Sequence, residues 1–184
     1  MCLNSTLLIL AFALCFAATA AEPALSDEVG KPEFVEKQMK SRSKQIEELI
    51  VLVKDPNCEM ASRISAVQLL GGLRAVEAVD VLFAHLTIIT PSKVKDKTIE
   101  GVAPCMPALV AIGKPSSEKA LTELAKETDA WRRFLLLTIL HRVEGNSLAQ
   151  HLLREAIRLA KGAPEKANLQ AALDHPSFKE EKPK

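Results

Sequence analysis

The chain has 184 residues, of which 48% are hydrophobic but only 4% aromatic, and it contains no tyrosine. This composition favours one all-α domain built by aliphatic helix packing, because strands are enriched in β-branched and aromatic residues. Lys and Arg number 24 against 23 Asp and Glu, so the net charge of +1 gives no reason to expect nucleic acid or an acidic membrane as a partner.

The first 21 residues have the pattern of a secretory signal peptide. Residues 7–21 carry no charge, and the run is shorter than the roughly 20 residues that a membrane-spanning helix needs. Since the run ends in small residues, we expect cleavage after Ala20 or Ala21 and a secreted or periplasmic chain. An uncleaved anchor stays open as an alternative, because no Lys or Arg precedes the apolar run. A lipoprotein site at Cys15 is less favoured, because Leu14 is not small.

Cleavage would leave Cys58 and Cys105 in an oxidising compartment. Aligning the helix breaks at Gly72 and Gly113 offsets the two cysteines by almost two turns, about 9 Å along the helix axis. A disulfide joins Cα atoms only about 4.4 to 6.8 Å apart. We therefore expect two small buried side chains in preference to a disulfide.

Residues 22–32 contain two prolines and a glycine and predict a flexible linker. Residues 33–54 predict a helix that is polar at first and apolar only from Ile46 onward, as in an amino-terminal cap. The stretch 63–86 predicts two antiparallel helices, with Gly71 and Gly72 breaking the chain between them and the second helix spanning 75–86. One apolar stripe per helix cannot be buried within a single hairpin, so the pattern predicts a stack of hairpins.

The stretch 88–101 has no periodicity and is basic in its middle. It is either a binding loop or a longer connection between repeats, and loop-length statistics favour the connection. Beyond it, the pattern predicts helices over 104–112 and 115–126 with Gly113 between them.

Residues 130–143 predict the least exposed helix, because 134–140 are apolar nearly all round. Trp131 is either a core residue or a binding hot spot, and burial tendency favours the core. Ser147 and Gln150 predict a capping box for a helix over 147–161. A last helix ends near Leu173, and 174–184 predict a disordered charged tail.

The sequence Leu70-Gly71-Gly72-Leu73, followed by Arg74 to Val79, resembles the turn and second helix of a HEAT repeat. Such short repeats also occur in phycobilisome bilin-lyase-like proteins. Residues 108–115 resemble the same junction in secreted bacterial HEAT-repeat proteins, although Leu73 runs directly into Arg74 where family members commonly place an acidic residue and a proline. The resemblance implies a short right-handed α-solenoid of stacked antiparallel helix pairs over 33–173, with about seven or eight helices.

No motif for catalysis, a cofactor or a metal is present. The four histidines lack HExxH or HxxxH spacing, the cysteines form no CxxC pair, and no GxSxG, Walker or GxGxxG sequence occurs. We expect His85 and His151 on the outer sides of their helices. The sequence therefore predicts neither an enzyme nor a metalloprotein.

The resemblance implies that the chain binds another protein through a concave inner surface lined by second helices. The candidate binding residues, graded from acidic to basic along the stack, are Glu77, Asp80, Glu123, Lys126, Arg154 and Arg158. We expect a monomer without cofactor. The alternative is a lyase-like enzyme accessory that would use the thiol of Cys58 or Cys105. DNA binding conflicts with the leader and the neutral charge.

Overall fold

The computed structural model describes residues 32–88 and 102–176, which form helices joined by short turns. The predicted signal peptide with its cleavage site at Ala20 and Ala21, nearly all of the linker, the loop over 89–101 and most of the charged tail lie outside the described residues. Eight α-helices, one 3-10 turn and no strand occur within the described ranges, which confirms the all-α prediction.

Most helix bounds fall within a few residues of the prediction. The helices are α2 (Pro32–Lys54), α3 (Met60–Gly72), α4 (Val79–Ala84), α6 (Cys105–Ile112), α7 (Lys114–Leu124), α8 (Ala130–Glu144), α9 (Asn146–Leu159) and α10 (Ala163–Leu173), with a 3-10 turn at Val76–Ala78 before α4.

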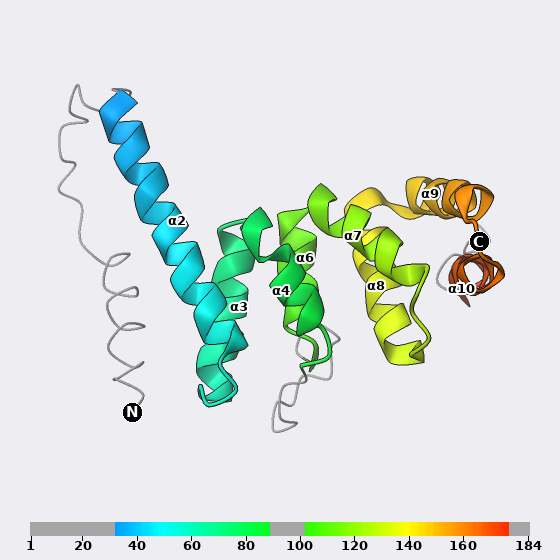
Figure 1. Ribbon diagram of the computed structural model, residues 1–184, viewed down its shortest axis with the longest axis horizontal. Helices are drawn as coiled ribbons and strands as arrows, with labels where there is room; N and C mark the ends of the chain where they lie inside the picture. Colours follow the sequence, from blue (N-terminus) through cyan, green and yellow to red (C-terminus); the bar gives the residue numbers. More distant parts are fainter. Residues whose placement is uncertain (1–31, 89–101, 177–184) are drawn as a thin grey trace, which may run out of the picture.

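The helices follow one another in sequence order along the long axis of the molecule (Figure 1). Helices α3, α6 and α8 form a row, because α3 packs against α6 and α6 packs against α8. Helix α2 covers the far side of α3 at one end, and α9 and α10 pack on each other at the opposite end (Figure 1). One apolar core runs through all of these contacts.

The pairing of neighbouring helices differs from the prediction. We expected α3 and α4 to pack back to back, but α4 has its most extensive contact with α6, and α3 packs chiefly against α6 and α2. Helix α7 packs most extensively on α8, not on α6. The physical reason at α4 is its length of six residues, which is too short to cover the thirteen residues of α3.

Helix α3 ends at Gly72, within the predicted glycine pair, and the chain turns at Arg74, whose φ of 48° is left-handed. Gly71 itself lies within the last turn of α3. A Cβ atom at Gly71 would lie 2.7 Å from the Cα atom of Ala108 in α6. Gly71 is therefore required for the close approach of α3 to α6, a role that the sequence did not indicate.

The second predicted helix, 75–86, is only partly formed. Val76 begins a 3-10 turn, and this tighter winding moves its side chain out of the expected stripe, so that it is 52% exposed. Leu82, Phe83 and Leu86 are buried as expected.

Helices α2 and α8 behave as predicted over most of their length. In α2, Ile46 and Val53 are buried, whereas residues 36–44 are exposed. In α8, the five residues Leu135, Leu136, Leu137, Ile139 and Leu140 are buried. Trp131 is 37% exposed, because it stands at the first turn of α8, beyond the packed part of that helix. Its ring centroid lies 5.7 Å from that of Phe134.

Helix α9 begins at Asn146, one residue earlier than predicted, after Gly145 with a φ of 78°. Ser147 is then inside the helix, so the predicted capping box does not form, and Gln150 instead donates to the Asn146 side-chain oxygen over 3.1 Å. Of the apolar side chains in α9, Ala149 and Leu153 are buried, whereas Leu148 is 44% exposed.

Across residues 32–88 and 102–176, none of the helices combines the length and the apolar character that a membrane crossing requires.

Candidate binding surface

Four of the six predicted binding residues lie in the helices expected for them: Asp80 in α4, Glu123 in α7, and Arg154 and Arg158 in α9. Glu77 lies in the 3-10 turn before α4, and Lys126 lies just after the end of α7. What the sequence did not indicate is that the three acidic members are all engaged with cations of other helices.

Lys119 of α7 joins two of the predicted acids. Its Nζ lies 3.1 Å from the Asp80 carboxylate of α4 and 3.8 Å from the Glu123 carboxylate one turn further along α7. The hydrogen bond and charge of Asp80, with a smaller contribution from Glu123, raise the pKa of Lys119 above its ordinary value. This lysine therefore links α4 to α7, which are separated in the sequence by residues 85–113, including α6.

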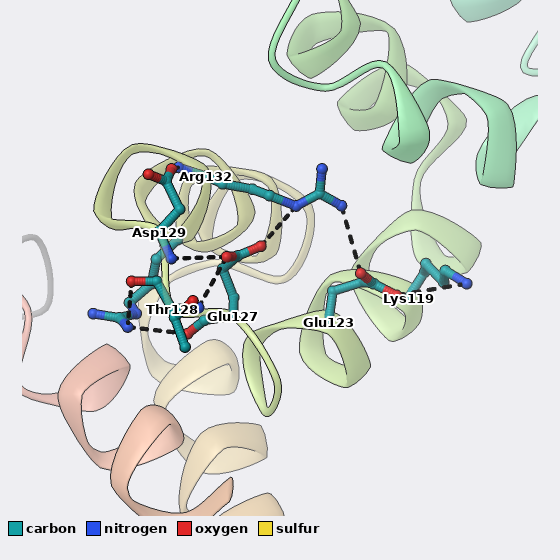
Figure 2. A network of polar contacts seen from close by, with 7 residues as sticks. Lys119, Glu123, Glu127, Thr128, Asp129 and Arg132 are labelled. Atoms are coloured by element: carbon teal, nitrogen blue, oxygen red, sulfur yellow. Dashed lines mark hydrogen bonds and ion pairs between the residues drawn. The ribbon is translucent and has the colours of Figure 1, made fainter. Parts of the chain in front are cut away.

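The chain of ion pairs continues into α8 (Figure 2). The Glu123 carboxylate lies 3.5 Å from the Arg132 guanidinium, and Arg132 Nε lies 2.7 Å from the Glu127 carboxylate. The other carboxylate oxygen of Glu127 accepts from the backbone N–H groups of Thr128 and Asp129 over 2.9 and 2.8 Å. With its side chain only 13% exposed, Glu127 anchors the turn that begins α8.

We call these residues the ion ladder: Asp80, Lys119, Glu123, Glu127 and Arg132. Sequence reasoning missed Lys119, Glu127 and Arg132. The i, i+4 spacing of Lys119 and Glu123 was a visible signal, whereas the pairs that cross from one helix to another have no signature in a single sequence.

Glu77 pairs with the neighbouring helix α2. The Arg42 guanidinium of α2 lies 3.5 Å from the Glu77 carboxylate and donates to the Leu73 carbonyl over 3.0 Å. Arg42 thereby fastens the exposed part of α2 to the turn that follows α3.

The basic candidates have a different environment. Arg154 donates to the Gln150 side-chain oxygen over 2.8 Å, and Arg158 pairs with Glu155 within α9 over 2.8 Å. The hydrogen bond and charge of Arg158 lower the pKa of Glu155, so this carboxylate is ionised. Lys126 is exposed and takes part in no ion pair with the described residues. Uncompensated charge on the second helices is therefore concentrated at the carboxyl-terminal end and is positive.

The thiols are not arranged for chemistry. Cys105 is fully buried, carries a free thiol and donates to the His85 carbonyl over 3.3 Å, so the disulfide with Cys58 is not formed. Burial raises the pKa of Cys105 to about 12, against a smaller opposing effect of Arg63. This thiol does not ionise near neutral pH.

His85 is half-buried, not on the surface as expected. It lies at the end of α4 beside α6, where the Cys105 thiol donates to its carbonyl. Burial, followed by the charges of Arg63 and Lys54, lowers its pKa below the ordinary value. His151 is exposed, as predicted.

Within the part of the chain that the structure describes, no three His, Cys, Asp or Glu side chains gather in a way that could hold a metal ion. Comparisons of the whole chain with models of protein families, with curated proteins and with solved structures found no match.

Proposed function

We propose that the chain is an exported HEAT-like scaffold, a short right-handed α-solenoid of stacked helix pairs that binds another protein through the surface of its second helices. In this proposal α3, α6 and α8 are the first helices of successive pairs, and α4, α7 and α9 are the second helices, with α4 and α7 packed mainly on the first helix of the following pair. Export rests on the signal-peptide pattern of residues 1–21.

The observation that carries the proposal is the row of α3, α6 and α8 along the long axis. A row in which each helix contacts the next is typical of repeat proteins, whose extended surfaces bind other macromolecules. The ion ladder adds support, because it connects α4, α7 and α8 in the same order as the row.

The solenoid arrangement can be tested through the locality of its stability. In a repeat stack each unit depends mainly on its neighbours, so a cavity at one end has little effect at the other. Leu169 in α10 is 1% exposed. We expect Leu169→Ala to accelerate amide hydrogen exchange in α9 and α10 while protection in α3 and α6 stays unchanged. Equal acceleration in all helices would indicate a single cooperative core instead.

Partner binding can be tested by site-specific photo-crosslinking in an extract of the source cells. A photo-reactive residue in place of Lys126, at the end of α7, should yield a defined crosslinked protein. The matched control is Ala111, which is exposed on the first helix α6. The same products from both positions, or none from Lys126, would contradict the proposed binding surface.

The alternative role, a lyase-like enzyme accessory, has less support. It needs an accessible thiolate, and the Cys105 thiol is buried with a pKa raised to about 12. Cys58 is half-buried, and no group of side chains that could hold a metal ion lies among the described residues.

A further inference from the structure

We draw no further inference here: the strongest candidate, the exposed side of α9 that carries Leu148 and Leu159, is an apolar surface interrupted by the ionised Glu155 carboxylate, and nothing in the structure shows what covers it.

Discussion

The contact between α3 and α6 and the contact between α7 and α8 join successive helices by different means. At α3–α6 the backbones approach so closely that only glycine fits at position 71 opposite Ala108. At α7–α8 the apolar core is bounded at both ends by polar groups, with Glu127 and Arg132 at one end and a hydrogen bond from Ser117 to Glu144 at the other.

The two contacts show what determines the distance between each pair of packed helices. Because the backbones of α3 and α6 meet at Gly71 and Ala108, no side chain there can change rotamer to accommodate a larger group. The distance between these two helices is therefore fixed by the backbone contact. Long charged side chains can change rotamer, so α7–α8 tolerates small changes but depends on satisfied carboxylates and N–H groups. Each contact should therefore fail under a different kind of substitution.

The largest effect is expected from Gly71→Ala. The added methyl group would meet the Ala108 backbone at 2.7 Å, so α3 and α6 must separate, at a cost of about 1–3 kcal/mol in unfolding free energy. Gly72→Ala is the matched control, because nothing lies within 4 Å of its Cβ position, and it should be neutral or slightly stabilising. Urea unfolding of both variants measures the difference. Equal stability of the two would show that the α3–α6 contact is not set by this backbone approach.

The second contact is tested by Glu127→Ala. The substitution leaves the N–H groups of Thr128 and Asp129 and the Arg132 guanidinium without their acceptor, which should cost about 1–2 kcal/mol. Asp80→Asn, at the other end of the ion ladder, is the control, because its side chain is 81% exposed and should contribute little. Thermal unfolding followed by circular dichroism compares them. A larger loss from Asp80→Asn would mean that the buried end of the ladder does not dominate.

A gain is expected where α3 ends. Arg74 has a left-handed φ of 48°, which side chains other than glycine adopt at a cost. Arg74→Gly should relieve this cost and raise the unfolding free energy by about 0.5–1 kcal/mol. The control is Lys37→Gly, at an exposed position inside α2, which should destabilise the chain because glycine weakens a helix interior. Loss of stability in Arg74→Gly would show that the Arg74 side chain contributes more than the backbone strain costs.

The smallest effect concerns the pH dependence of stability, which we attribute to His85 at the end of α4. Because the folded state lowers the pKa of His85, the unfolded chain binds the proton more readily, and stability should fall as the pH drops through about 6.5. His85→Gln should flatten the dependence of the urea midpoint on pH between roughly pH 7 and pH 5, relative to the parent chain. An unchanged slope in His85→Gln would assign the acid sensitivity to other groups.

The helical positions could be predicted because their signals are local. The predicted break at Gly113 is correct, since this residue has a positive φ that glycine adopts without strain. The start of α8 also has a local signal, because Thr128 and Asp129 can both cap a helix, and Asp129 accepts from the Arg132 N–H over 2.7 Å. The position of Trp131 was not predictable in this way, because its exposure depends on how far the neighbouring helices extend past the first turn of α8.

The candidate surface was predictable only in part. Four of the six residues lie in the expected helices, but the cations that engage Glu77, Asp80 and Glu123 come from α2, α7 and α8. Periodicity indicates which side of a helix is polar and contains no information about the charge on the helix opposite.

The sequence by itself determined that the chain is helical, where most of the helices end, and which apolar side chains enter the core, because each of these depends on residues within one or two turns. Only the tertiary structure decided that Gly71 lies in a close helix contact, that α7 packs on α8, and that the acidic candidates pair with cations of other helices. Those features depend on which distant segments meet, and that is settled by the joint packing of all the helices.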